Sequence, residues 1–168
     1  MNESTDNRQS LIMSEIMTPE KANFAGNIHG GHLMEMLDRV AYACAARYSS
    51  CYVVTLSADR ILFRKPIHVG ELVTCYANIN YVGHSSMEVG IKVTAENLIS
   101  GETRHTNSCY FTMVALDENH KTTTVPPLTL DTAMQKRRQE EAKLRRTLRQ
   151  QFDQQHAKHK AEIRDQYQ

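Results

Sequence analysis

The 168-residue sequence contains no tryptophan, only four prolines, and no excess of one charge, since its formal net charge is +1. No apolar run approaches the roughly 20 residues that a membrane-spanning helix needs. The polar start of the chain, residues 1–10, lacks the apolar stretch of a secretory signal. Forty per cent hydrophobic residues fit an ordinary folded domain rather than a disordered chain. We therefore expect a cytoplasmic protein that does not enter a membrane.

The sequence also lacks a recognisable set of metal or nucleotide ligands. The four cysteines lie in apolar segments without metal-ligand spacing, and buried free thiols are the expected outcome. They are Cys44, Cys51, Cys75 and Cys109. His29 and His32 are three positions apart, but no third ligand is spaced to complete a zinc site. There is no phosphate-loop or dinucleotide motif. We expect neither a metal nor a cofactor.

The pattern of apolar residues predicts one helix and a run of long strands. From Gly30 to about Tyr48, apolar and small residues cover most of a helical circumference, which is typical of a helix buried on nearly all sides. The later segments are rich in β-branched and aromatic residues and partly alternate with period two. The predicted strands are Ser10–Met17, Tyr52–Phe63, Glu71–Val82, Ser86–Ile99 and Arg104–Leu116. Short connections favour an antiparallel meander, so we expect an α+β fold in which a sheet wraps around a central helix.

The end of the chain differs in composition from the rest. Residues 131–168 hold 10 Lys and Arg against 6 Asp and Glu, whereas residues 1–130 hold 10 against 13. Leu144, Leu148 and Phe152 form a weak amphipathic stripe, without a sustained heptad repeat. We expect a disordered lead over 1–9, a folded domain over 10–127 and a charged helical extension over 128–168, frayed or docked on an oligomer partner. Because the tail has few aromatics and no DNA-binding motif, we expect a solvated helix and no nucleic-acid partner.

The most informative segment is 23–38, NFAGNIHGGHLMEMLD. Gly30 and Gly31 have no Cβ and allow close approach of a ligand to the backbone. A helix that begins there offers unpaired N–H groups and the positive end of its dipole, which suits a developing negative charge. Asn27 and Asp38 add an amide and a carboxylate to the segment.

This segment resembles the signature of the hotdog-fold acyl-CoA thioester hydrolases. Further matching blocks are 54–57 (VTLS) with Asp59, 63–70 (FRKPIHVG) and 83–89 (GHSSMEV), in family order and at family spacing over roughly residues 10–117. The resemblance implies a hotdog fold and hydrolysis of an acyl-CoA to a free acid and coenzyme A. It implies that Asp38 acts as general base or nucleophile, and that Asn27 is a second active-site residue.

Each of these residues also has a simpler interpretation. Asp38 can be a solvated side chain beside Glu35 and Arg39, but the apolar turns around it argue for a poorly solvated carboxylate suited to catalysis. Asn27 can be a loop or cap residue. We predict that the N–H of Gly31 polarises the thioester carbonyl.

His29 and Gly30 are expected near the mouth of the substrate site. We expect His29 to pack or hydrogen-bond there rather than to catalyse.

A basic cluster at the end of a predicted strand is the candidate site for coenzyme A. Arg60, Arg64 and Lys65 can either protect a sheet edge or bind the phosphates of the substrate, for which Arg is well suited. Ser85 and Ser86 either make a turn or donate to the nucleotide portion. The resemblance favours phosphate binding, without assigning side chains to individual phosphates.

Spacing along the predicted helix bears on the oligomeric state. Asp38 lies about 12 Å along the helix from its start, at roughly 1.5 Å per residue. One carbonyl is therefore not expected to contact Asn27 and Asp38 of the same chain. In a homodimer with shared active sites, one subunit would provide the loop with Asn27 and the other would provide Asp38. The resemblance implies such a dimer and its assembly into a trimer of dimers.

Two other functions remain open at this point. A hotdog hydroxyacyl-thioester dehydratase would pair a histidine with a carboxylate, and the motif here fits the hydrolases better. A non-catalytic acyl-CoA-binding or regulatory module is the second alternative.

Overall fold

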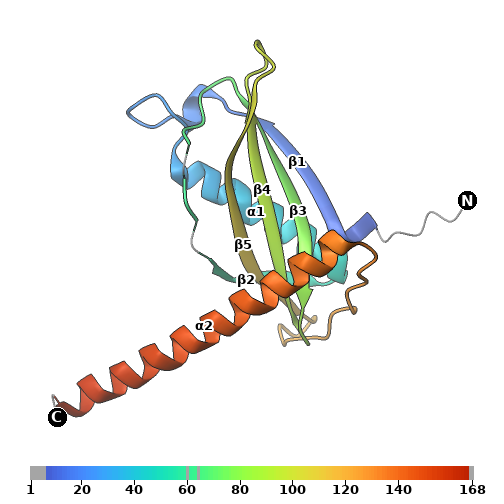
Figure 1. Cartoon of the computed structure of the whole chain (residues 1–168), viewed down its shortest axis with the longest axis vertical. Coiled ribbons are helices and arrows are strands. Elements are labelled where there is room, and N and C mark those ends of the chain that lie inside the picture. Colours follow the sequence, from blue (N-terminus) through green and yellow to red (C-terminus); the bar gives the residue numbers. More distant parts are fainter. Residues whose placement is uncertain (1–6, 60, 64, 167–168) are drawn as a thin grey trace, which may run out of the picture. The chain divides into compact units, whose positions relative to one another are not determined.

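The computed structural model describes residues 7–59, 61–63 and 65–166. Five strands form one antiparallel sheet in the order β1-β3-β4-β5-β2, which curls around the central helix α1 (Figure 1). The strands are β1 (Ser10–Ile16), β2 (Tyr52–Ala58), β3 (Leu72–Val82), β4 (Ser86–Glu96) and β5 (Thr103–Leu116). The helices are α1 (Gly30–Ser49) and α2 (Ala133–Gln166), with short 3-10 turns at Asn7–Gln9 and Pro19–Lys21. The predicted sheet around a central helix is confirmed.

Helix α1 has one buried face and one exposed stripe. Its buried residues face the sheet and form the main core together with alternate residues of the central strands. They include Leu33, Met36, Leu37, Val40 and Cys44. The exposed stripe contains Met34 and Tyr42, 37% and 42% exposed. The expectation of a helix buried on nearly all sides is therefore wrong for one protomer, because a single curled sheet can cover only one side of a helix.

The three central strands form a meander, but β2 does not continue it. β2 pairs with β5 at the sheet edge instead of with β3, which follows it in sequence. β2 also ends at Ala58, five residues earlier than predicted. Apolar residues 61–63 suggested a longer strand. They belong instead to the connection that carries the chain from β2 across to β3.

Three cysteines are fully buried, and none of them forms a disulfide. Burial raises the pKa of the Cys44, Cys75 and Cys109 thiols to about 12 in each case. All four cysteines are free, and Cys51 is partly exposed. The prediction of buried free thiols is confirmed for Cys44, Cys75 and Cys109, whereas Cys51 is free but not buried.

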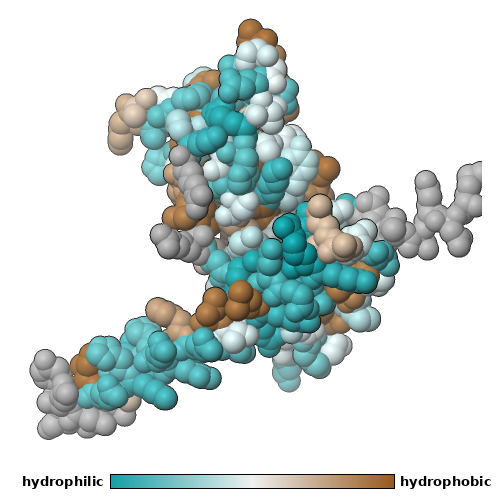
Figure 2. Space-filling model, in the orientation of Figure 1, coloured by the Kyte–Doolittle hydropathy of each residue, from teal (hydrophilic) through white to brown (hydrophobic). Residues whose placement is uncertain are grey.

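The C-terminal segment forms a compact unit of its own that begins at Thr129. Thr132 and Gln135 cap its helix reciprocally: the Gln135 backbone N–H donates to Thr132 Oγ1 (3.2 Å), and the Thr132 N–H donates to Gln135 Oε1 (2.8 Å). The predicted helical tail is confirmed, and Figure 2 shows a mostly hydrophilic surface along it. Across residues 7–59, 61–63 and 65–166, no helix is long and apolar enough to span a bilayer.

Candidate active site

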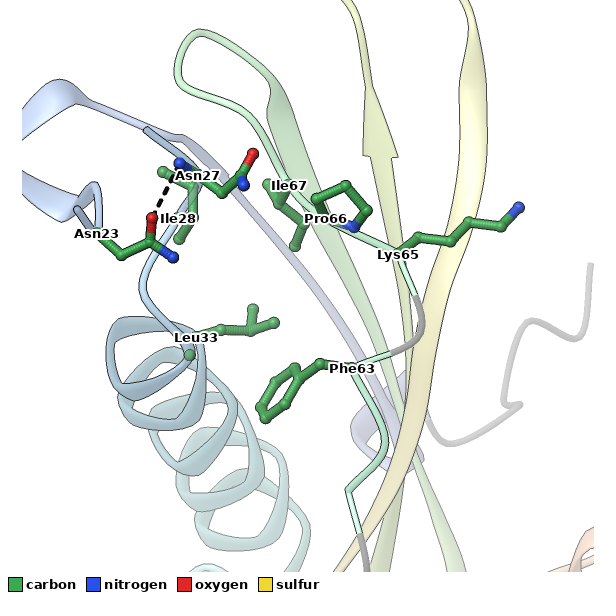
Figure 3. Close-up of a pocket in the computed structure, with 9 residues that line it drawn as sticks. Asn23, Asn27, Ile28, Leu33, Phe63, Lys65, Pro66 and Ile67 are labelled. Atoms are coloured by element: carbon green, nitrogen blue, oxygen red, sulfur yellow. Dashed lines mark hydrogen bonds between the residues drawn. The ribbon is translucent and has the colours of Figure 1, made fainter. Parts of the chain in front are cut away.

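A cavity of about 360 Å³ opens at the start of α1. It lies between the loop that precedes the helix and the β2–β3 connection (Figure 3). We call it the cradle, and its lining residues are Asn23, Asn27, Ile28, Gly30, Leu33, Phe63, Lys65, Pro66 and Ile67. Apolar side chains form most of the wall, with two amides and one ammonium group at the rim. Such a lining suits an apolar ligand that carries a polar reacting group.

The loop before α1 is held by the side chain of Asn23. Its Oδ1 accepts from the backbone N–H groups of Ala25 (2.9 Å) and Asn27 (3.2 Å). The backbone N–H of Asn23 donates to the Asn27 carbonyl (2.6 Å). Because Oδ1 already accepts two hydrogen bonds, the Asn23 side chain can contact a ligand mainly through its Nδ2 donor. Ile28 N–H donates to the Ile67 carbonyl (2.8 Å), which joins this loop to the opposite wall of the cradle.

The two glycines at the helix start are not equivalent. His29 Nδ1 accepts a hydrogen bond from the Gly31 N–H (2.9 Å) and caps the helix. This bond places the His29 ring proton on Nε2. The N–H of Gly30, which lines the cradle, has no acceptor among the described residues. In this structure the Gly31 donor is engaged and the Gly30 donor is available.

A buried ion pair supports the far wall of the cradle. Arg104 Nη1 and Nη2 donate to the two carboxylate oxygens of Glu71 (2.5 and 2.7 Å), and Nη2 also donates to the Pro66 carbonyl (2.7 Å). The His68 N–H donates to Glu71 Oε2 (2.8 Å). Hydrogen bonds from Arg104 hold the pKa of the Glu71 carboxyl below its usual range, against the effect of burial. The pair fixes the backbone on both sides of Ile67.

Asp38 lies outside the cradle, on the exposed stripe of α1. Thr55 Oγ1 on β2 donates to Asp38 Oδ1 (2.6 Å), which fixes the carboxylate against the edge strand. Arg39 pairs with Glu35 and Glu15, 3.6 Å in each case, and not with Asp38. The expected poorly solvated carboxylate is not found in one protomer, where this residue is exposed.

Exposed apolar side chains surround this carboxylate. Met34 and Tyr42 flank Asp38 one helical turn to either side, and the Tyr42 ring contacts Tyr52 of β2 with centroids 6.3 Å apart. Tyr52 is 54% exposed. We call Met34, Tyr42 and Tyr52, together with Asp38, the Asp38 surface. Exposed apolar side chains beside an edge strand are typical of an interaction site.

Of the residues predicted to bind the phosphates of coenzyme A, the described ones, Lys65, Ser85 and Ser86, lie in two separate places in one protomer. Lys65 lines the cradle, whereas Arg60 and Arg64 lie outside the described residues. Ser86 begins β4 opposite Val114, and Ser85 precedes it. Arg104 contacts the carbonyl of Pro66, the residue after Lys65. Val114, the partner of Ser86, lies ten positions farther along β5, or about 33 Å along the strand.

Among the described residues, no group of three or more His, Cys, Asp or Glu side chains is arranged to hold a metal ion. His29 and His32 contact each other edge to face, with ring centroids 6.1 Å apart.

Two residues of this region were missed as candidates from the sequence. Thr55 holds the Asp38 carboxylate, and Asn23 organises the loop and lines the cradle. Both stand inside the motif blocks, but only the three-dimensional contacts distinguish them from their neighbours.

Comparison with known proteins adds a family context. The thioesterase superfamily model matches residues 25–101. Protein VdlD of Helicobacter pylori is 49% identical over 145 residues, which are 86% of this chain and 83% of that protein. An uncharacterized acyl-CoA thioester hydrolase of Zymomonas mobilis is 38% identical over 67% of this chain and 76% of that protein.

Solved structures are similar over most of the chain. The crystal structure of an apo hexameric acyl-CoA thioesterase has a TM-score of 0.84 and 32% identity, and covers 87% of this chain and 94% of that chain. The Staphylococcus aureus acyl-CoA hydrolase in complex with butyryl coenzyme A and coenzyme A has a TM-score of 0.81 and 27% identity, over 92% of this chain and 96% of that chain. Alanine variants of that hydrolase replace an asparagine, an aspartate 15 positions later and a threonine 17 positions after the aspartate.

Proposed function

Because this chain belongs to the thioesterase superfamily and is an acyl-CoA thioester hydrolase, we propose that it hydrolyses its substrate at a site shared by two protomers. One protomer provides the cradle and the other provides Asp38. Water attacks the thioester carbonyl while the Asp38 carboxylate accepts its proton. The tetrahedral intermediate then expels the coenzyme A thiolate, which takes up a proton, and the free acid is released.

The Thr55–Asp38 hydrogen bond is the observation that carries this proposal. A hydroxyl that donates to one carboxylate oxygen at 2.6 Å leaves the other oxygen to face a water molecule. The S. aureus variants support the same pair, because their spacing of 15 and 17 positions is matched here by Asn23, Asp38 and Thr55.

The same spacing favours Asn23 over Asn27 as the amide that orients the substrate. Asn23 Nδ2 is the donor left after Oδ1 has accepted two backbone N–H groups. Asn27, at 11 positions before Asp38, lines the cradle and hydrogen-bonds through its backbone. We propose that Asn23 Nδ2 orients the thioester group.

The oxyanion is best stabilised by the Gly30 N–H. It lines the cradle and has no acceptor among the described residues, whereas the Gly31 N–H is engaged by His29. One donor of this kind contributes on the order of 100- to 1000-fold in rate. The Gly31 donor would contribute only if the His29 ring turned away.

A homodimer brings the two halves together. Asp38 stands eight residues after Gly30, about 12 Å along α1, and does not line the cradle of its own chain. The Asp38 surface combines exposed apolar side chains with the unpaired edge of β2, and a second copy would cover both. The hexameric state of the similar thioesterase supports a trimer of such dimers.

The remaining parts of the proposal concern coenzyme A and cellular context. Lys65, with Arg60 and Arg64, would bind the phosphates, and Ser85 and Ser86 would reach them from a neighbouring protomer. The chemistry requires no metal or other cofactor. We place the protein in the cytoplasm, where it would act on fatty acyl-CoA.

Two measurements test the shared site. Asp38→Asn should lose about 100- to 10,000-fold in kcat while the protein stays folded, whereas Glu35→Gln, on the same exposed stripe, should retain activity. Mixing Asn23→Ala with Asp38→Ala subunits should restore activity through heterodimers that carry one intact site. A folded, active Asp38→Asn enzyme would refute the role of Asp38, and inactive verified heterodimers would refute sharing. Hydration of an enoyl-CoA without release of thiol would favour the dehydratase alternative.

A further inference from the structure

A second cavity lies along the free edge of β5, beyond the end of β2. β2 pairs with β5 only from Phe111 onward, so the earlier residues of β5 have β4 on one side and no strand on the other. The β2–β3 connection spans this edge between two anchors. The Asp59 N–H donates to the Tyr110 carbonyl (2.8 Å), and Arg104 donates to the Pro66 carbonyl (2.7 Å).

A cavity of about 490 Å³, which we call the β5-edge cavity, lies beside Leu62 and Lys65 of this connection. Its lining residues are Leu62, Lys65, His105, Thr106, Asn107, Ser108 and Tyr110. Leu62 and Tyr110 provide apolar wall. His105 Nε2 and Ser108 Oγ hydrogen-bond each other at 3.0 Å.

Asn107 is the unusual member of this lining. Its side chain is 3% exposed, its Oδ1 accepts from Thr106 Oγ1 (3.1 Å), and its Nδ2 has no acceptor among the described residues. Folded proteins rarely leave a buried amide donor without an acceptor, because its lost hydration is not replaced. A ligand with a carbonyl oxygen in this cavity would satisfy the group.

Lys65 connects this cavity to the cradle, because it lines both. Figure 3 shows its side chain running away from Asn23 and Leu33, so that its ammonium group lies on the side away from the helix start. A substrate whose reacting carbonyl sits in the cradle would therefore pass Lys65 when its leaving group extends toward β5. The leaving group of an acyl-CoA begins with a flexible arm that contains two amide groups and ends in a diphosphate.

We propose that the β5-edge cavity binds the pantetheine arm of the acyl-CoA, with Asn107 Nδ2 donating to an amide carbonyl of that arm. Lys65, at the boundary of the two cavities, faces the negative charge of the diphosphate. This inference rests on the proposed function and deepens it, because it assigns a chemical group of the substrate to residues of β5. Free coenzyme A carries the same arm and uses the same contact.

The test compares one acyl group on three thiols: coenzyme A, pantetheine and 2-mercaptoethanol, which has no amide. Asn107→Leu removes the donor, and Asn107→Asp replaces it by an acceptor of the same shape. Both should raise KM for the coenzyme A and pantetheine thioesters by about three- to tenfold, the effect of one lost hydrogen bond. The kcat/KM for the 2-mercaptoethanol thioester should not change. Asn119→Leu, in an exposed turn, is the matched control.

Two results would overturn the inference. Equal losses on all three thioesters would assign Asn107 to the fold or to the cradle, and unchanged KM on all three would exclude the arm from the cavity. If Asn107→Leu does not fold, the Asn107→Asp comparison decides by itself.

Failure of the proposed function is distinguishable from failure of this inference. A wild-type enzyme that hydrolyses no acyl-CoA would refute the function. Calorimetric titration with pantetheine would still decide the cavity, because weaker binding to the Asn107 variants supports it and equal binding overturns it.

Discussion

Removing Arg104 should destabilise the protein far more than removing an ordinary surface charge. Arg104→Met leaves the Glu71 carboxylate, whose side chain is 6% exposed, without its bidentate partner, and leaves the Pro66 carbonyl without a donor. Breaking a buried ion pair from one side costs about 3–5 kcal/mol. For a chain of this size that corresponds to a fall in Tm of about 6–20 °C.

The double variant provides the matched control. Arg104→Met combined with Glu71→Gln removes both charges and keeps a polar group beside the His68 N–H. Because no uncompensated charge remains, it should be more stable than Arg104→Met alone. Urea denaturation at fixed protein concentration measures both, since an oligomer's stability depends on concentration. Equal stability of the single variant and the wild type would refute the assignment of a buried, coupled pair.

The pH dependence of the same pair has a defined sign. The Glu71 carboxyl has its pKa lowered by Arg104 in the folded protein, relative to an ordinary value of 4.5. Its contribution to stability is therefore present above that value and is lost as the pH falls through the lowered pKa. The stability difference between wild type and Glu71→Gln should shrink as the pH falls below about 4.5, and a difference that grows in acid would contradict this sign.

Three further substitutions probe the site and the sheet. Thr55→Val should lower kcat by about 10- to 100-fold, because a hydrogen bond to a charged group is lost, whereas Thr55→Ser should retain most activity in the same steady-state assay. His29→Ala should lower the free energy of unfolding by about 0.5–2 kcal/mol through loss of the helix cap, and His29→Asn, which keeps an acceptor, should recover part of it in urea titrations. Gly90→Ala would place a Cβ 2.2 Å from Asn80 Nδ2 and should lower the free energy of unfolding by about 1–3 kcal/mol. The Gly90→Ala/Asn80→Ala double variant should recover part of this stability. A Gly90→Ala variant as stable as wild type in thermal melts would show that the Asn80 side chain moves aside freely.

The sequence alone predicted the bounds of the elements whose apolar residues pack into the core of one protomer. The helix over Gly30–Ser49 agrees with its predicted range to within one residue, because a glycine pair, an apolar run and a serine pair mark its ends. The central strands β3, β4 and β5 agree to within three residues at each end, because their β-branched and aromatic residues are bounded by turn residues. The alternation in β4 predicted one exposed face, but both faces are buried over residues 87–91.

The failures occur where apolar residues serve something other than the core of one protomer. Residues 61–63 read as strand, but Phe63 lines the cradle and Leu62 lines the β5-edge cavity. Met34 belongs to the apolar pattern that predicted a buried helix, yet it is exposed on the same stripe as Asp38. A hydrophobicity pattern cannot distinguish packing within a chain from packing against a ligand or a second chain.

The candidate site was predictable in part. The motif identified the segment 23–38 but did not distinguish Asn23 from Asn27 or Gly30 from Gly31. Those choices depend on which groups are already hydrogen-bonded within the chain. Asn23 Oδ1 and the Gly31 N–H are both engaged in such bonds. The partner of Asp38 was also hidden, because Thr55 stands 17 positions away on another element.

The order of the strands has a consequence for synthesis of the chain. Both sheet edges, β1 and β2, come from the first 58 residues, while the three strands between them follow as one local meander over 72–116. Local contacts form fastest, so we expect the late meander to fold as the nucleus and the edges to dock on it. The segment that bears Asn23 and Asp38 therefore leaves the ribosome before its scaffold exists, and it gains its shape only after residue 116 has emerged.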